Sequence, residues 1–108
     1  MAILLTEQKN LNGVIVENLY HDSKSLAKTS YNYSTNQLTV TFQKGNVYAY
    51  HAVPINIYES MKNSTSAGSY FQANIAKSFT YLKKGDVPIT FISDELFTKL
   101  PTTKVNDN

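Results

Sequence analysis

An alternating stretch in the middle of the chain constrains the fold most. Leu38, Val40 and Phe42 are separated by Thr39, Thr41 and Gln43, a period-two pattern of residues that favour β-strands. A short polar turn with a central glycine follows at residues 44–46, and residues 47–50 (VYAY) resume the strand pattern. The spacing predicts an antiparallel hairpin with a loop of about three residues.

Three more segments are predicted to form antiparallel strands. The apolar runs at residues 3–5 and 14–16 flank a polar stretch that ends in Gly13, which predicts a first hairpin. Leu26 to Tyr33 is expected to form another strand, turned at residues 34–36. Residues 20–25 are expected to be a polar connection.

Helical patterns follow the sheet. Pro54 suits the first turn of a helix over Pro54 to Asn63, and the small residues 64–69 break it. A second helix is predicted from about Ser69 to Tyr81, with Lys83 and Lys84 at its end and Gly85 as its stop. Residues 87–92 are expected to form an edge strand, residues 94–100 a short helix, and residues 102–108 a frayed tail.

These elements predict an α+β domain, an antiparallel sheet of about four or five strands with two helices packed on one face. Residues 1–108 form a single domain in this interpretation, with a core at 26–82, an N-terminal hairpin extension at 1–25 and a C-terminal extension at 83–108. The expected core consists of apolar residues from the hairpin and both helices: Leu38, Val40, Phe42, Val53, Ile57, Met61, Phe71, Ile75 and Phe79.

Composition limits the class of protein. Apolar residues make up 42% of the chain and charged residues 17%, which is typical of a globular domain. The apolar runs are too short for a membrane span or a signal peptide, so we expect a cytoplasmic protein. The chain has no cysteine, which excludes disulfides and thiol catalysis.

Charge is segregated along the chain. Residues 23–85 hold seven lysines against Glu59 alone, a net charge of +6, whereas both ends are mildly acidic. Clustered lysines favour a polyanion partner, because phosphate contacts release counterions. A surface merely solvated by lysines is the alternative. All ten basic residues are lysine, and without arginine, sequence-specific base recognition is disfavoured.

Catalytic and metal-binding patterns are not found. The two imidazoles, His21 and His51, have no spacing typical of metal ligands, and His51 is expected at the surface. Glu59 is the lone carboxylate of the basic centre, so a pair of acid and base carboxylates is not expected there. We therefore predict no enzymatic activity, no cofactor and no metal.

The stretch from Tyr31 to Phe79 resembles the KTSC domain, a small family named after C-terminal extensions of some lysyl-tRNA synthetases. The matching positions run in register without a gap: Tyr31, Leu38, Val40, Phe42, Gly45, Val47, Tyr48, Tyr50, Val53, Pro54, Tyr58, Ser66, Gly68, Tyr70, Phe71 and Ile75. The chain departs from the family pattern at Asn32, Gln72 and Ala76, where the family has Asp, Asn and Arg, although Lys77 follows Ala76.

The resemblance implies little about activity. KTSC domains occur on synthetases and as stand-alone proteins of bacteria and phages, with RNA binding as the suggested role. The composition, rich in Asn and Lys, is typical of a bacterial or phage product of an AT-rich genome. The oligomeric state stays open.

Aromatic and basic residues are the candidates for nucleic-acid binding. Tyr48 and Tyr50 share one face of a strand, where aromatic rings can stack unpaired bases. The full candidate set adds one more tyrosine and five lysines: Tyr48, Tyr50, Tyr70, Lys28, Lys44, Lys77, Lys83 and Lys84. The alternative is that both strand tyrosines pack under the helices.

The break between the helices is a candidate anion site. Ser66, Gly68 and Ser69 lie where a helix begins, and free N–H groups there suit a phosphate. An ordinary helix break with capping hydroxyls is the alternative.

Two hypotheses about function follow. The first is a non-enzymatic module that binds RNA or single-stranded nucleic acid through a basic, tyrosine-bearing face. The second is a protein-protein interaction factor, such as a phage protein that binds a host protein through the acidic ends. Exposed rings of Tyr48 and Tyr50 beside lysines favour the first, and buried rings with an apolar patch elsewhere favour the second.

Overall fold

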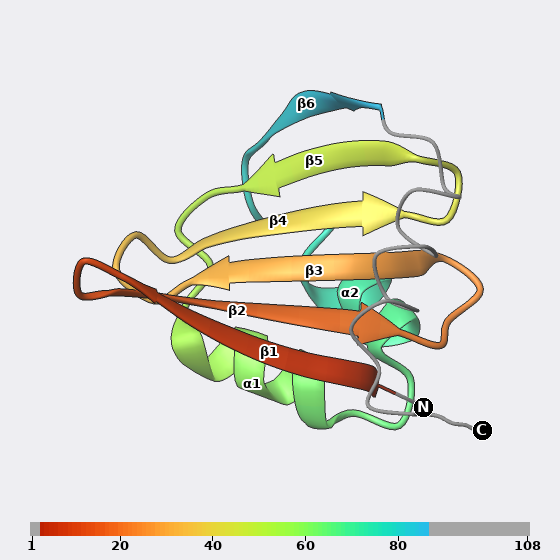
Figure 1. Ribbon diagram of the computed structural model, residues 1–108. Helices are drawn as coiled ribbons and strands as arrows, with labels where there is room; N and C mark the ends of the chain where they lie inside the picture. The colour runs from red at the N-terminus through yellow and green to blue at the C-terminus, as the bar shows by residue number, and fades with distance from the viewer. Residues whose placement is uncertain (1–2, 87–108) are drawn as a thin grey trace, which may run out of the picture.

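The structure is a computed structural model that describes residues 3–86. Six antiparallel strands form one sheet in sequence order, so each strand pairs with its predecessor (Figure 1). They are β1 (Ile3–Leu11), β2 (Val14–His21), β3 (Leu26–Asn32), β4 (Gln37–Phe42), β5 (Asn46–Tyr50) and β6 (Tyr81–Asp86). The helices α1 (Ile55–Asn63) and α2 (Ala67–Asn74) connect β5 to β6 and lie on one face of the sheet. The predicted α+β class is confirmed, with six strands instead of about four or five.

Both predicted hairpins form. Asn12 and Gly13 make the two-residue turn between β1 and β2 with positive φ angles of 57° and 87°. Gly45, with φ of 100°, turns β4 into β5, and its N–H donates to the Phe42 carbonyl at 2.8 Å. The β4–β5 register places Val40 opposite Tyr48, on one face of the sheet.

The first helix begins one residue later than predicted. Pro54 is its N-cap residue, and the Pro54 carbonyl accepts hydrogen bonds from the N–H groups of Ile57 and Tyr58. The second helix begins at Ala67, where the Ser66 hydroxyl caps it by accepting from the Ser69 N–H at 3.2 Å.

The predicted end of the second helix is wrong. α2 ends at Asn74, and residues 75–79 form turns that lead to β6. Lys83, Lys84 and Gly85 therefore belong to a strand that pairs with β5 and not to a helix end. The predicted polar connection at residues 20–25 is also partly wrong, because Tyr20 and His21 belong to β2 and both are buried.

Tyrosines fill much of the core. Leu38, Val40, Val53, Met61, Phe71 and Ile75 are buried as predicted, whereas Phe42, Ile57 and Phe79 are only partly buried. Three tyrosines that the pattern did not place inside, Tyr20, Tyr31 and Tyr58, are fully buried. The rings of Tyr31 and Tyr58 stack with centroids 4.2 Å apart, which fixes α1 on β3.

The strand and helix predicted beyond residue 86 lie outside the described residues. Within residues 3–86, neither helix has the length and apolar character that crossing a bilayer requires.

Candidate functional site

An aromatic groove of about 490 Å³ lies where α2, β5 and β6 meet. The side chains that line it include five aromatic rings, Phe42, Tyr48, Tyr50, Phe71 and Tyr81. The centroid of the Tyr81 ring is 5.3 Å from that of Tyr48 and 5.2 Å from that of Tyr50. The rings form one continuous cluster because strand pairing brings β6 beside β5, with Tyr81 opposite Tyr50.

The groove tyrosines differ in exposure. Tyr50 is buried, with 4% of its surface exposed, and Tyr48 is half-buried, whereas Tyr81 is 54% exposed. Burial raises the pKa of the Tyr50 hydroxyl, and the neighbouring Tyr81 and Tyr48 raise it further. The predicted pair of stacking residues therefore splits, and Tyr81 provides the accessible ring.

Lysines lie at the rim of this groove. Lys24 and Lys44 are exposed and line it from the β2–β3 connection and the β4–β5 turn. Lys83 is the register partner of Tyr48, so its side chain leaves β6 on the same face, and its ammonium lies 3.5 Å from the Asp86 carboxylate. The groove thus combines apolar walls with a positively charged edge.

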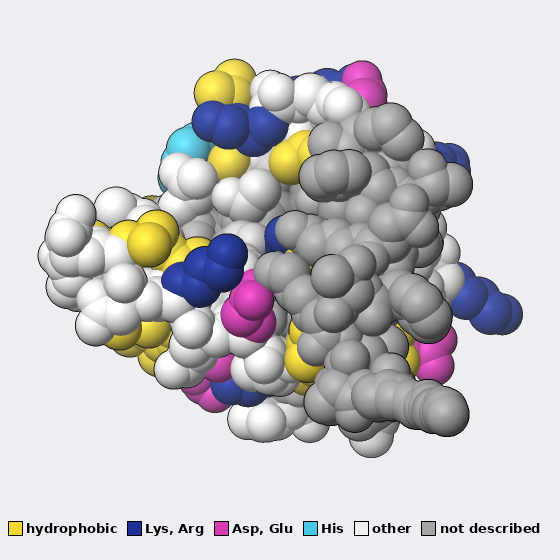
Figure 2. Space-filling model, viewed as in Figure 1, with side chains coloured by type: hydrophobic (Ala, Val, Ile, Leu, Met, Phe, Trp, Pro, Cys, Tyr) yellow, Lys and Arg dark blue, Asp and Glu magenta, His cyan; other side chains and the backbone are white. Residues whose placement is uncertain are grey.

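The other predicted lysines lie elsewhere. Lys28 lies on the opposite face of the sheet from the core residues Thr29 and Val40, with its ammonium 5.1 Å from the Tyr20 ring centroid. Lys77 and Lys84 are exposed outside both pockets, and Tyr70 is partly buried against the core. In Figure 2 lysine side chains appear at separate places on the face shown.

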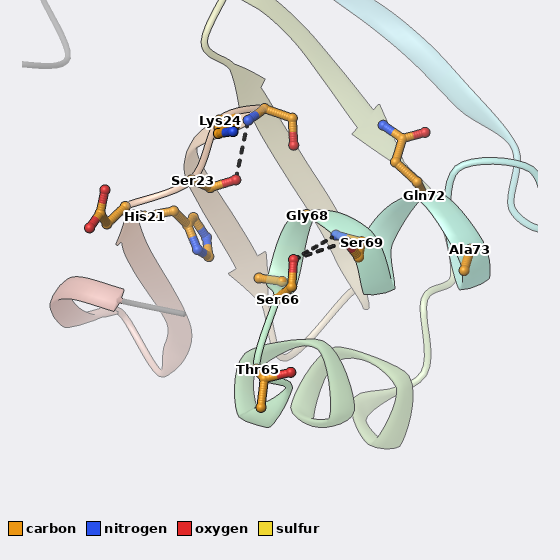
Figure 3. A pocket seen from close by; sticks show the side chains of 12 residues that line it. His21, Ser23, Lys24, Thr65, Ser66, Gly68, Ser69, Gln72 and Ala73 are labelled. Atoms are coloured by element: carbon orange, nitrogen blue, oxygen red, sulfur yellow. Dashed lines mark hydrogen bonds between the residues drawn. The ribbon is translucent and has the colours of Figure 1, made fainter.

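A second pocket, of about 670 Å³, lies between the end of β2 and the start of α2 (Figure 3). It contains all three predicted anion-site residues, Ser66, Gly68 and Ser69. A Cβ atom added to Gly68 would lie 2.6 Å from the Ser25 Oγ and 3.1 Å from the Ser23 Oγ. Only glycine therefore lets the first turn of α2 approach the β2–β3 connection this closely.

His21 forms part of the wall of this serine-lined pocket. The side chain is buried, and its Nε2 lies 2.8 Å from the Thr29 Oγ1. Its Nδ1 has no hydrogen-bond partner within the described part of the chain. Burial lowers the pKa of the imidazole to about 4, so the ring is neutral at neutral pH.

A buried carboxylate fixes α1 to the sheet. The Glu17 Oε1 accepts hydrogen bonds from the Tyr58 hydroxyl at 2.6 Å and the Lys62 ammonium at 3.0 Å, and its Oε2 accepts from Gln8 at 2.9 Å. Burial acts to raise the Glu17 pKa, but these three hydrogen bonds outweigh it, and the pKa is lowered. Lys62 is therefore engaged within the protein.

The sequence-based reasoning missed several residues of the two pockets. The sequence pattern predicts a helix end at Tyr81 and a polar connection at His21, whereas Tyr81 begins β6 and lines the groove, and His21 ends β2 and lines the second pocket. Thr80, Tyr81 and Leu82 favour a β-strand, and this short run is the one local indication of β6. It is too short to outweigh the helical pattern that precedes it. Among residues 3–86, no three His, Asp or Glu side chains lie close enough to hold a metal ion.

Comparison with known proteins shows that this chain is similar to a segment of some lysine–tRNA ligases. The lysine–tRNA ligase of Trichormus variabilis is 34% identical over 82 residues, which is 75% of this chain and 15% of the ligase. The lysine–tRNA ligase of a Nostoc species is 33% identical over 82 residues, with the same coverage. The chain thus corresponds to a small part of these curated relatives.

A solved structure shares the fold. A KTSC domain protein from Yersinia pestis superposes with a TM-score of 0.61 at 21% identity, covering 65% of this chain and 99% of that one. The family model of the KTSC domain matches residues 22–79, which include both pockets except for Tyr81 and His21. The chain therefore belongs to the KTSC domain family.

Proposed function

We propose that this chain is a non-enzymatic binding module that holds single-stranded RNA, with an unpaired base in the aromatic groove. The observation that carries the proposal is the exposed ring of Tyr81 beside Tyr48, above a floor formed by Tyr50 and Phe71. Every base has a π-face, so a stacked base gains about 1–3 kcal/mol without being read by sequence.

The rim of the groove suits the backbone of such a strand. Lys24 and Lys44 bring two positive charges to the groove edge, within reach of phosphates on either side of a stacked base. Lysine acts as a point charge and does not form the forked contacts of arginine, which favours binding with little base specificity. The groove therefore combines aromatic rings that can stack a base with lysine charges that can contact phosphates.

The relatives support RNA as the ligand class. The proteins from Trichormus variabilis and a Nostoc species that contain a similar segment are named lysine–tRNA ligases, a name that includes tRNA. We infer that the segment has the same class of partner here and that the protein acts in the cytoplasm of a bacterium or of a phage-infected cell. The alternative, a protein-protein interaction factor, draws on exposed apolar residues of β6, where Leu82 is 59% exposed.

Fluorescence anisotropy with labelled single-stranded RNA tests the proposal. Tyr81→Ala should weaken binding by about 5- to 100-fold, the loss of one stacked base, whereas Tyr81→Phe should retain it. Lys44→Gln should weaken binding and reduce the salt dependence by about one phosphate contact, and Lys9→Gln on the remote strand β1 is the control. Equal affinities for Tyr81→Ala and the unmodified chain, with a protein captured instead through β6, would favour the alternative.

A further inference from the structure

The serine-lined pocket between β2 and α2 contains several hydrogen-bond donors that have no partner among residues 3–86. The backbone N–H groups of Ala67 and Gly68 make no hydrogen bond to another described residue. The Ser23 Oγ accepts from the N–H groups of Ser25 and Leu26, both at 3.2 Å, which leaves its own hydroxyl proton to donate. A ligand in this pocket meets mainly donors.

The buried imidazole adds an independent observation. His21 has 4% of its surface exposed, its Nδ1 has no partner, and its side chain lines the pocket. Figure 3 shows the His21 ring extending from the end of β2 toward the first turn of α2. A buried ring nitrogen without a partner costs free energy, so a ligand atom that bonds to it is favoured.

The Thr29 hydroxyl permits the required tautomer. A hydroxyl can donate or accept, so the 2.8 Å contact with the His21 Nε2 is compatible with a proton on either ring nitrogen. When Thr29 donates to Nε2, the neutral ring has its proton on Nδ1, which can then donate to a ligand atom.

We propose that this pocket binds a phosphate group, held by the His21 Nδ1–H, the free N–H groups at the start of α2 and the Lys24 ammonium. A phosphate accepts hydrogen bonds with all of its free oxygens, which matches a wall of donors. The Asp22 carboxylate also lines the pocket and opposes an anion, so inorganic phosphate alone binds weakly.

The position of the pocket indicates the source of the phosphate. Lys24, Ser25 and Gln72 line both this pocket and the aromatic groove, so the two are neighbours across one wall. A nucleotide unit can therefore place its phosphate in one pocket and its base in the other. The phosphate site depends on its own residues and does not require the groove to bind RNA.

A titration with inorganic phosphate, followed through the backbone amide signals, tests the site. The amides of Ala67 and Gly68 should shift at millimolar phosphate, and nitrogen shifts of the His21 ring should report the Nδ1–H tautomer in the bound state. Lys24→Gln should weaken binding about five- to tenfold, and Asp22→Asn should strengthen it about twofold or more. Lys84→Gln makes the same charge change on β6 and should leave binding unchanged.

Further arms with adenosine monophosphate, and with RNA that has a 5′-phosphate or a 5′-hydroxyl, identify the source of the phosphate. If only adenosine monophosphate binds more tightly than inorganic phosphate, the source is a free nucleotide. If the 5′-phosphorylated RNA binds more tightly than the 5′-hydroxyl RNA, the source is an RNA end. Absence of shifts at Ala67 and Gly68, or equal losses in Lys24→Gln and Lys84→Gln, would overturn the proposal. Either result leaves the test of Tyr81 in the groove unaffected.

Discussion

The hydroxyl of Tyr58 donates a hydrogen bond of 2.6 Å to the buried carboxylate of Glu17, and this contact joins α1 to β2 across 41 residues of sequence. The same carboxylate accepts from the Lys62 ammonium, one helical turn further along α1. A carboxylate with 1% of its surface exposed is costly to bury alone, so these donors are part of what makes the fold stable.

Tyr58→Phe should therefore destabilise the domain while preserving its packing. The substitution retains the ring that stacks on Tyr31 and removes only the donor to Glu17. We expect a loss of about 1.5–3 kcal/mol in the free energy of unfolding, the range for hydrogen bonds to charged groups. Urea denaturation measures this loss, and an unchanged midpoint would show that Glu17 is satisfied without Tyr58.

Lys62→Met should also destabilise the fold, because it leaves Glu17 without its positive partner. The side chain of Lys62 is only 25% exposed, so methionine replaces its apolar contacts but not its charge. The expected loss is about 1–3 kcal/mol by urea denaturation. Lys77→Met, at an exposed lysine, is the matched control, and equal effects of the two substitutions would contradict the assigned role of the ion pair.

His21 should make stability dependent on pH in a defined window. Its pKa falls from 6.5 in the unfolded chain to about 4 in the folded one because burial disfavours the charged ring. The unfolded chain binds the proton first, so the stability that is fully present above pH 6.5 should be lost as the pH falls toward 4. The loss should be on the order of 3 kcal/mol.

Urea denaturation of the unmodified protein and of His21→Gln, measured across this pH range, distinguishes the contribution of His21 to stability from that of the carboxylates. The variant should lose the part of the slope that His21 contributes between pH 6.5 and about 4, and it should retain the part that Glu17 contributes because folding lowers the Glu17 pKa. Parallel pH profiles for the two proteins would contradict a buried neutral His21.

Gly68→Ala should destabilise the domain although alanine is the better helix former. The added Cβ would lie 2.6 Å from the Ser25 Oγ, which outweighs the gain of about 1 kcal/mol expected for alanine in a helix. Adding Ser25→Ala removes that oxygen and leaves its Cβ 4.0 Å away, but the Ser23 Oγ still lies 3.1 Å from the added Cβ, so the double variant should recover part of the lost stability. A double-mutant cycle of melting temperatures tests this, and purely additive effects would contradict the close contact.

The sheet around β4 and β5 could be predicted because local and tertiary preferences agree there. Leu38 and Val40 alternate with threonines, and Gly45 supplies the positive φ that the turn requires. The second helix could not be bounded in the same way. Tyr70 to Phe79 continue a helical stripe, and lysine and leucine after Tyr81 are good helix formers. Pairing with β5, a tertiary interaction, decides that Tyr81–Asp86 is a strand.

The buried polar groups could not be predicted from the sequence, because their partners lie far away along the chain. Glu17 lies in a strand whose pattern is typical of a solvent-facing charge, and its partners Tyr58 and Lys62 lie on a distant helix. Residue types alone indicate an anion-site candidate at Ser66, Gly68 and Ser69, where α2 begins. The contribution of His21 depends on how β2 approaches α2, which no local pattern shows.

The central claim, that unpaired RNA bases stack in the aromatic groove, is tested most directly by mapping a short single-stranded RNA onto the protein by backbone amide shifts. The account predicts shifts along β5, β6 and α2 around Tyr48 and Tyr81, with an affinity that falls steeply as salt is raised. Shifts confined to the opposite face, around Lys28 and Tyr20, or no binding at low salt, would contradict it.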